Sequence, residues 1–580
     1  MLAHSIFRVA LLVALTALAL PAAAKESASE FKVNVVPFGP TQEDVDALDA
    51  ALPDQPAVQA LLKGSNFRRL HTEMIEPDVK KSGASLPPSR FRAVFYDYTK
   101  QRAVVVEGAV ADRASITAKV VPDWQPDPSD EEFAQAVAVI SSDATIGPDI
   151  ASGNLTVYRP MPPVQDRDAN GKPATQRVIN VGLSPAAGVD KARHEIVGAD
   201  LVAQTVTHYA NHAPLGAAVN AQPNCGSPNA SQSTTARGTA GQFQLTVTSG
   251  STTLWEMLVI RPSASSGTRA SGIEVRDVKY KGISVLKRGH VPILNVKYTN
   301  DLCGPYRDWQ WQEGQFATTP GATLLAPGIL DNGTTPATTA LETGTDTGNF
   351  KGVAIYREGS EVVLVTELEA GWYRYIHEWR FDSNGAIRPR FGFGTTVNSC
   401  TCVQHAHHVY FRLDIDIDGP VNQVYEIPVG ATNTDDLPAY RVATEKKITR
   451  VLGTSNYYRF RGGKKSYILV AGANDGMADT YARGDLWLLQ YKSGVSNLLA
   501  EIDDGHNNTV GSGTEADLDQ FVNGESLNGQ DIVAWYHATV THSPALTSFM
   551  CTPTGLGIAG RNILTGDKVV GPDLLPEDLN

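Results

Sequence analysis

The 580-residue sequence has few cysteines, a shortage of positive charge and almost no long apolar run, and each shortage excludes a class of protein. Five cysteines are too few for disulfides to be the main source of stability, and the odd number leaves at least one free or bonded elsewhere. The net charge of −13 argues against a nucleic-acid-binding protein. Beyond the N-terminal region, no stretch approaches the roughly 20 apolar residues that a membrane-spanning helix needs.

The N-terminal region does contain the pattern of a secretory signal peptide. Arg8 precedes an apolar run from Val9 to Leu20, and alanines 22–24 supply an A-x-A cleavage site. We therefore predict that residues 1–24 are a signal peptide and that the mature protein is secreted or periplasmic. An exported protein lies in an oxidising compartment, where disulfides are permitted.

Two small α+β domains are predicted after the signal peptide, at residues 30–122 and 123–209. In the first, a helix is predicted to begin after Thr41, and the alternating segment FRAVFYDYTKQRAVVVEGAV predicts a hairpin. In the second, Ser129 and Glu132 form a capping box, and the strand-like segments LTVYRP and RVINVGL follow it. Both units therefore combine one or two helices with short strands.

A stretch without helical or strand periodicity, residues 210–242, is dominated by Ala, Gly, Ser, Thr, Asn and Pro and is interpreted as a linker. From residue 243 to 580, β-branched and aromatic runs recur between turn residues, with almost no amphipathic helix. This pattern predicts a large antiparallel β-sandwich. The predicted fold class is mainly β, with two small α+β domains ahead of the sandwich.

The stretch HAHHVYFRLDIDIDG, which begins at His405, concentrates titratable side chains in a predicted strand. Period-two alternation places His405 and His407 on an apolar face and His408 on the opposite, acidic face. Two imidazoles at i and i+2 can reach one copper or zinc ion, although buried histidines bonded to backbone carbonyls are the alternative. The nearby Cys400 and Cys402 would suit a zinc site only if every donor converged.

This stretch resembles the copper amine oxidases, in which an H-x-H pair is followed after a fixed gap by an L-D-x-D-x-D-G segment. His405 and His407 occupy the positions of the pair, and LDIDIDG begins at Leu413 with the same offset. Near the C-terminus, DIVAWYHATVTHSPALTSFMCTP is similar to the segment that delivers the third copper ligand of the family. The resemblance, which covers nearly the whole mature chain, implies that His542 completes the copper site.

Acidic residues of the same strand suit a second, harder metal such as calcium or manganese, although alternating carboxylates are often a solvated strand end. The family has a peripheral metal site that takes an Asp eleven residues before the third copper ligand. The resemblance therefore implies a site formed by side chains and backbone of Asp414, Ile415, Asp416, Asp531 and Ile532.

The segment EVVLVTELEAGWYRYIHEWRF is similar to the strand that, in the family, bears the tyrosine oxidised to topaquinone, and the position falls on Tyr373. The segment VPILNVKYTNDLCGPYRDWQWQEGQF resembles the stretch with a tyrosine that hydrogen-bonds the quinone, here Tyr298. Fourteen residues later the family has its catalytic Asp, and this sequence has Gln312. Without the resemblance, Tyr373 reads as an ordinary core residue of a sheet.

Three positions depart from the family pattern. In the family, the cofactor tyrosine stands in the motif N-Y-D or N-Y-E, whereas Tyr373 is flanked by Trp372 and Arg374. A tryptophan cannot make the polar contacts that the asparagine makes in the family. Gln312 cannot accept a proton. Asp308 and Glu313 are alternative proton acceptors, but the sequence favours interpreting both as surface or loop carboxylates.

The resemblance implies a copper-dependent oxidase that converts a primary amine to an aldehyde, with dioxygen as co-substrate and ammonia and hydrogen peroxide as further products. It also implies a homodimer. The departures at the cofactor tyrosine leave an alternative, which is a copper-binding protein of the same fold with lost or altered catalysis.

Overall fold

The structure is a computed structural model, which describes residues 31–75, 77, 83–122, 124–160, 176–185, 195–208, 237–238, 240–265, 269–298, 306–343, 347–395, 404–428, 440–450, 456–472, 475–492, 516–542, 556–558, 561–563 and 569–579. The predicted signal peptide and all five cysteines lie outside these ranges. Among the described residues, no helix is long and apolar enough to cross a lipid bilayer.

The first small unit is a four-stranded antiparallel sheet covered by two helices: α1 (Gln42–Ala51), α2 (Pro56–Leu62), β2 (Phe67–Ile75), β3 (Arg90–Asp97), β4 (Arg102–Ala109) and β5 (Thr117–Val121). The Thr41 hydroxyl accepts from the backbone N–H of Asp44, whose carboxylate accepts in return, so the predicted helix start is confirmed. The predicted hairpin is β3 and β4.

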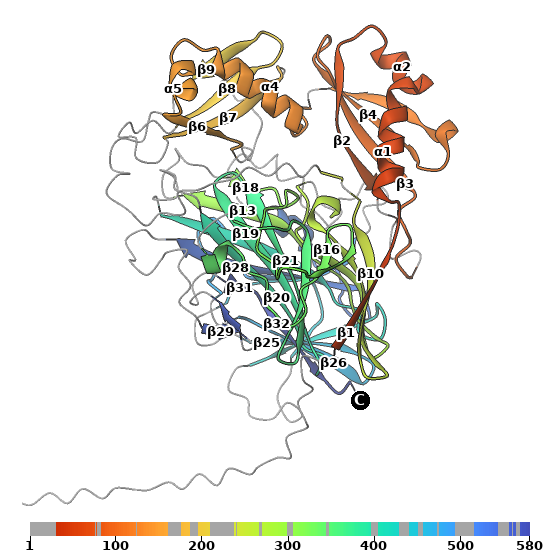
Figure 1. The fold of residues 1–580 in the computed structure, drawn as a ribbon. Coiled ribbons are helices and arrows are strands. Elements are labelled where there is room, and N and C mark those ends of the chain that lie inside the picture. Colours follow the sequence, from red (N-terminus) through yellow and green to blue (C-terminus); the bar gives the residue numbers. More distant parts are fainter. Residues whose placement is uncertain are drawn as a thin grey trace, which may run out of the picture.

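The second small unit repeats this plan: α4 (Asp130–Ser141), α5 (Gly147–Ala151), β6 (Leu155–Tyr158), β7 (Val178–Pro185), β8 (Glu195–Asp200) and β9 (Thr205–His208). Ser129 and Glu132 form the predicted capping box. Glu132 is also bonded by the buried guanidinium of Arg177, which ties the helix to the start of β7. Figure 1 shows both small units at one end of the molecule, next to the large sandwich.

One face of the sandwich is the histidine sheet, so named because it contains His405 and His407. In pairing order its main strands are β1 (Phe31–Pro37), β10 (Gln242–Ser249), β11 (Thr252–Ile260), β12 (Glu274–Tyr280), β13 (Ile283–Tyr298), β21 (His405–Asp414), β28 (Ile532–His542), β27 (Leu486–Gln490) and β24 (Lys446–Ile448). The short strand β14 (Tyr306–Arg307) pairs with β13.

The other face is the tyrosine sheet, which contains Tyr373. In pairing order its main strands are β15 (Thr323–Ala326), β16 (Ile329–Asp331), β17 (Val353–Glu358), β18 (Glu361–Ala370), β19 (Tyr373–Asp382), β20 (Ile387–Thr395), β32 (Asp573–Glu577), β26 (Lys465–Val470), β25 (Tyr457–Gly462), β22 (Gln423–Ile427) and β23 (Tyr440–Val442). Smaller elements are β31 (Val569–Val570) beside β20, the hairpin β29 (Leu556–Ile558) and β30 (Arg561–Ile563), and α6 (Ala340–Thr343).

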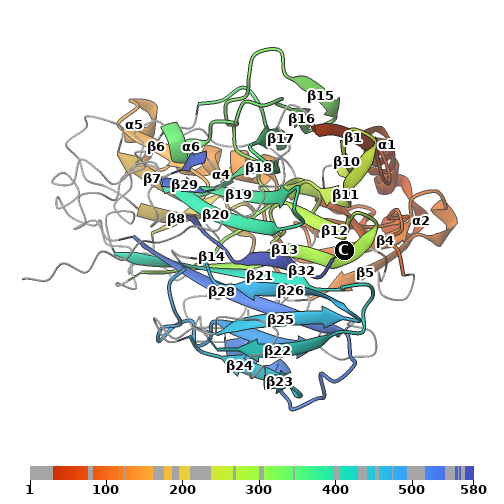
Figure 2. The same ribbon diagram turned by 90° about the horizontal axis from the view of Figure 1, so that it is seen from below.

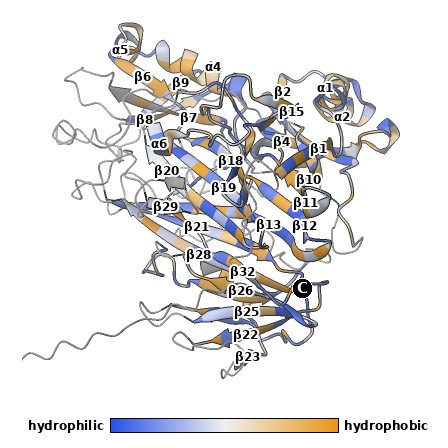
Figure 3. Cartoon of the chain, turned by 60° about the horizontal axis from the view of Figure 1, so that its bottom comes forward, coloured by the Kyte–Doolittle hydropathy of each residue, from blue (hydrophilic) through white to orange (hydrophobic). Residues whose placement is uncertain are grey.

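The main hydrophobic core lies between the two large sheets and draws on both of them. Figure 2 shows the layers from below, and Figure 3 shows apolar and polar residues alternating along their strands. Such alternation is what a sheet with one face in the core requires. The predicted fold class, mainly β with α+β units before a large antiparallel sandwich, is confirmed.

The histidine sheet begins with a strand that the sequence placed in the first small domain. β1 pairs with β10 along its whole length, from Phe31 opposite Ser249 to Pro37 opposite Phe243. Its alternating segment FKVNVVP completes an edge of the sandwich, although residues 30–122 were predicted to form a separate unit. Of the predicted linker 210–242, the structure describes residues 237, 238 and 240–242, and Gln242 already belongs to β10.

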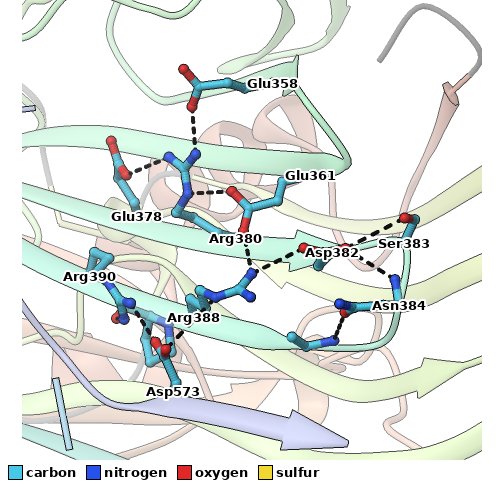
Figure 4. Close-up of polar contacts among 12 residues, drawn as sticks. Glu358, Glu361, Glu378, Arg380, Asp382, Ser383, Asn384, Arg388, Arg390 and Asp573 are labelled. Atoms are coloured by element: carbon cyan, nitrogen blue, oxygen red, sulfur yellow. Dashed lines mark hydrogen bonds and ion pairs between the residues drawn. The ribbon is translucent and has the colours of Figure 1, made fainter. Parts of the chain in front are cut away.

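The outer side of the tyrosine sheet carries a buried network of charges (Figure 4). Arg380 of β19 is fully buried and contacts three carboxylates, those of Glu358, Glu361 and Glu378. Arg388 joins the network through Glu361. Burying charges is tolerable only when each has its partners, so this network holds β17 to β20 in one arrangement.

Replacing Arg380 by Leu is expected to lower the free energy of unfolding by about 3–5 kcal/mol, because it strands buried carboxylates without their cation. Urea unfolding followed by circular dichroism measures this change. Arg461→Leu, at an exposed arginine of β25, is the matched control and should cost little. Equal losses in the two variants would contradict a special role for the network.

Candidate active site

His405 and His407 lie two residues apart at the start of β21, with both side chains buried in the core. Their exposed fractions are 1% and 0%, and their ring centroids are 5.1 Å apart. Val409 and Phe411 of the same face also pack into the core, as period-two alternation predicts. The two imidazoles are close enough to bind a single ion.

A third histidine position lies beside this pair in the sheet. The register places His405 between Tyr298 of β13 and His542 of β28. Directly opposed residues of an antiparallel ladder share a face of the sheet. The side chain of His542 lies outside the described residues, so the ladder gives its backbone position only.

Tyr373 is the first residue of β19, and its ring meets the histidines across the core. Its ring centroid is 4.6 Å from that of His407 and 5.6 Å from that of His405. The hydroxyls of Tyr373 and Tyr298 are hydrogen-bonded to each other, and Phe393 stacks on His407 with centroids 3.7 Å apart. Burial raises the pKa of both tyrosines well above its usual value, so both are neutral phenols near pH 7.

Trp372, which precedes Tyr373, belongs to the same cluster. Its indole N–H donates to the hydroxyl of Tyr298 at 3.0 Å. This polar contact differs from any that an asparagine would make, but it links residue 372 to the ring of Tyr373 through Tyr298. Sequence spacing could not indicate this contact, because Tyr298 lies on a strand of the opposite sheet.

Arg374, which follows Tyr373, stabilises the turn between β18 and β19. It lies 3.4 Å from the carboxylate of Glu369 and donates to the carbonyl oxygens of Gly371 and Tyr373. These contacts favour a structural ion pair over the binding of an anionic substrate.

Tyr375, two residues along β19, connects the histidines to a carboxylate. Its ring stacks on that of Tyr373 with centroids 5.5 Å apart. Its hydroxyl donates to the carboxylate of Asp308 and lies 3.2 Å from Nδ1 of His407. His407, Tyr373 and Asp308 are therefore joined through the side chain of Tyr375.

Asp308 is not the surface or loop carboxylate that the sequence favoured. It is 1% exposed, and burial raises its pKa to about 7, with Tyr375 and Arg269 acting in the opposite direction. Among the described residues, its Oδ1 has no hydrogen-bond partner. The pairing of β14 with β13 brings it in, since its N–H donates to the carbonyl of Leu294. The sequence contained only a weak sign that Asp308 is buried, namely that it is the one acidic residue among the aromatic residues of PYRDWQW.

Gln312 and Glu313, the other residues considered at this position, are held by the neighbouring strand. The N–H of Glu369 donates to the carbonyl of Gln312 at 2.8 Å, and Gln312 is 3% exposed. Glu313 is fully buried in an ion pair with Arg261. It too is a buried residue, and its negative charge already has a cation.

Three carboxylates converge at the end of β21, outside the core. Oxygen atoms of Asp414, Asp416 and Asp531 lie within 4.8 Å of one another. Ile415 and Ile532 lie next to them in the chain, and their side chains belong to the core. Only their backbone carbonyls could therefore contribute to a metal site here.

His408 faces away from the core, as the alternation predicts. Its Nδ1 lies 3.1 Å from Nε2 of His537 of β28, and the two rings are stacked. It takes no part in the cluster around Tyr373. The zinc alternative with Cys400 and Cys402 falls outside the described residues.

No family model matches the chain. The sequence is 22% identical over 354 residues to copper amine oxidase 1 of Aspergillus niger, covering 49% of this chain and 52% of that protein. It is 23% identical over 269 residues to a copper-containing amine oxidase, gamma 1, of Arabidopsis thaliana, covering 35% and 36%. The chain thus spans about half, or less, of the length of these curated relatives.

Solved structures show the same fold over nearly the whole chain. A copper-containing benzylamine oxidase from Hansenula polymorpha superposes with a TM-score of 0.57 at 13% identity, covering 94% of this chain and 97% of that one. A lysyl oxidase from Pichia pastoris gives 0.54 at 14% identity, covering 96% and 90%.

Proposed function

Since this chain is a relative of the copper amine oxidases, we propose that it is a copper-dependent primary-amine oxidase. It would convert an amine to an aldehyde, reduce dioxygen to hydrogen peroxide and release ammonia, using a quinone made from Tyr373. The observation that carries the proposal is the position of this ring, buried against His405 and His407 and hydrogen-bonded to the hydroxyl of Tyr298.

The donor set fits copper. His405 and His407 supply two buried imidazoles, and His542 occupies the adjacent ladder position of β28. The hydroxyl of Tyr375 meets Nδ1 of His407, which orients the ring so that Nε2 would bind the metal. Bound copper would activate dioxygen, and the quinone would offer an electrophilic carbonyl to the amine.

The residues of this chain have separate tasks in that reaction. Tyr298 holds the oxygen of the Tyr373 ring. Asp308, rather than Gln312, would accept the proton from the α-carbon of the amine, because its carboxylate is buried beside Tyr375 and its pKa of about 7 suits a base near neutral pH. The amide side chain of Gln312 cannot act as the base, and the backbone carbonyl of this residue accepts a hydrogen bond from the N–H of Glu369.

The decisive experiment uses the wild-type protein. Metal-free protein receives Cu(II) in air, and a visible chromophore that reacts with phenylhydrazine is expected to form. Parallel samples with Zn(II), or with Cu(II) under argon, should stay colourless. A copper-loaded protein that never reacts with phenylhydrazine would sink the oxidase proposal and leave the alternative, a copper-binding protein with lost or altered catalysis.

A second metal is proposed at the carboxylates of Asp414, Asp416 and Asp531, with backbone oxygens of Ile415 and Ile532. Carboxylate and carbonyl oxygens favour calcium or manganese over copper. The three oxygens already lie within reach of one ion. This site would stabilise the end of β21 without touching the Tyr373 cluster.

Asp416→Asn is expected to remove the stabilisation that calcium or manganese gives the copper-loaded protein. An ion at 100 times its dissociation constant contributes about 2.7 kcal/mol, which differential scanning calorimetry detects as a higher Tm. The matched control is Asp418→Asn, an exposed carboxylate of the same strand end that pairs with Lys465. If both variants lose the same ion-dependent rise in Tm, the site is wrongly assigned.

We further propose that the protein is exported, secreted or periplasmic, and acts as a homodimer. The signal-peptide pattern of residues 1–24 supports export. N-terminal sequencing of the mature protein tests export, and the mass measured by light scattering tests the homodimer.

A further inference from the structure

The turn before Tyr373 directs a tryptophan into the core. Gly371, at a φ of 58°, and Trp372 are the two residues that join β18 to β19, since Ala370 pairs with Tyr373. Glycine at the first central position is the pattern of a type II′ hairpin turn, where other residues are strained. Trp372 is 1% exposed, although residues of tight turns usually lie at the surface.

Aromatic rings from three parts of the chain pack around this indole. Its ring centroid lies 5.7 Å from that of Tyr158, 5.9 Å from Tyr306 and 6.2 Å from Tyr373, all edge to face. Edge-to-face pairs at this spacing are attractive and favour particular orientations. The indole therefore has little freedom to rotate.

Tyr158 comes from the second small unit, at the end of β6, yet it belongs to the core of the sandwich. Its ring lies over Gly182 of β7, where an added Cβ would fall 2.1 Å from the ring. A glycine is therefore required there to leave room. The second small unit, which Figure 1 shows beside the sandwich, thus sends one side chain against Trp372.

The polar contact of Trp372 has a direction. An indole N–H can only donate, so the oxygen of Tyr298 accepts from it. A buried hydroxyl hydrogen needs an acceptor, and the oxygen of Tyr373 is hydrogen-bonded to this hydroxyl. Either hydroxyl can donate while residue 373 is a phenol, but a quinone carbonyl only accepts, so the donors would then run from Trp372 to Tyr298 to residue 373.

We propose that Trp372 and Tyr158 are positioning residues for the cofactor ring, with Trp372 orienting the Tyr298 hydroxyl toward residue 373 and Tyr158 fixing the indole. The inference rests on the proposed function, because it assigns these two residues to the quinone made from Tyr373. It gives the second small unit a part in the active site.

The first test compares Trp372→Phe with Trp379→Phe in copper-loaded protein. Trp372 lies in the turn before β19 and Trp379 lies on β19, and both side chains are buried. The indole N–H of Trp372 donates to the hydroxyl of Tyr298, and that of Trp379 donates to the carbonyl of Ile273. We expect Trp372→Phe to shift the quinone absorption maximum and to slow the phenylhydrazine reaction about tenfold, the rate change of one net hydrogen bond. Trp379→Phe should change neither.

A wild-type protein without a chromophore would refute the proposed function itself, whereas an unchanged spectrum and rate in Trp372→Phe would refute only this inference. Tyr158→Leu should reproduce the spectral shift and lower kcat more than it raises KM. An effect of Trp379→Phe as large as that of Trp372→Phe would show that the change comes from general loss of packing.

The second test needs neither copper nor activity. Protein labelled with 5-fluorotryptophan has eight tryptophans, and the ¹⁹F signal missing from Trp372→Phe identifies residue 372. Tyr158→Leu and Tyr298→Phe should each move this signal in metal-free protein, whereas Trp379→Phe should leave it in place. A signal that neither tyrosine variant moves would overturn the proposed contacts.

Discussion

Tyr373→Phe is expected to bind copper normally, to form no phenylhydrazine-reactive chromophore and to oxidise no amine. Phenylalanine keeps the ring against the two histidines but lacks the hydroxyl that is hydrogen-bonded to Tyr298 and from which oxidation would start. The loss of turnover should therefore be complete, because no other group supplies the electrophilic carbonyl. Copper content by atomic absorption, the visible spectrum and peroxide production measure the three effects.

The control for this variant is Tyr410→Phe, the same change at a tyrosine of β21 that is also fully buried but faces the other side of the sheet. It should retain the chromophore. A chromophore that persists in Tyr373→Phe would show that another tyrosine is oxidised, and Tyr375, stacked on residue 373, would be the next to test.

Asp308→Asn is expected to form the chromophore but to lower kcat by about 10²–10⁴-fold, the range by which a positioned acid or base accelerates a reaction. An amide has nearly the shape of the carboxylate and can still contact Tyr375, but it cannot accept a proton. Amine deuterated at the α-carbon should then react more slowly still, because proton removal limits the rate. Stopped-flow reduction of the chromophore measures this step.

The matched control is Glu313→Gln, which also neutralises a buried acid of the same segment. Glu313 is paired with Arg261, so its loss should lower stability without a comparable loss of kcat. If Glu313→Gln abolishes turnover and Asp308→Asn does not, Glu313 rather than Asp308 is the base.

The pH dependence follows from the raised pKa of Asp308. A base must be ionised to accept a proton, so kcat/KM, which reports the free enzyme, should be lost as the pH falls through about 7 and retained above it. An unshifted carboxyl, with a pKa near 4, would place this loss about three pH units lower. The limb near pH 7 should be absent from the residual activity of Asp308→Asn.

The alternation of HAHHVYFRLDIDIDG was sufficient to separate the core histidines from His408, because a strand has only two faces. The starts of α1 and α4 were equally predictable, since the residues that cap each helix lie within its first turn in the sequence. Features set by short-range geometry could thus be predicted from the sequence.

Features set by distant contacts could not be predicted in this way. Asp308 was judged by its spacing from Gln312 in an extended strand, but the pairing of β14 with β13 sets its position instead. The contact between Trp372 and Tyr298 joins residues 74 positions apart on opposite sheets. Similarly, nothing in FKVNVVP indicates that β1 completes a sheet whose other strands begin at residue 242.

The pairing of β1 with β10 also bears on how the molecule folds. Phe31 is synthesised before both small units, whereas its partner Ser249 follows only after both have been made. Closing so long a loop is slow. Until β10 has formed, β1 is an unpaired strand that can pair with a non-native partner. Folding of the sandwich should therefore be rate-limited by this late closure, and β1 should be among the last of the described strands to become protected from hydrogen exchange.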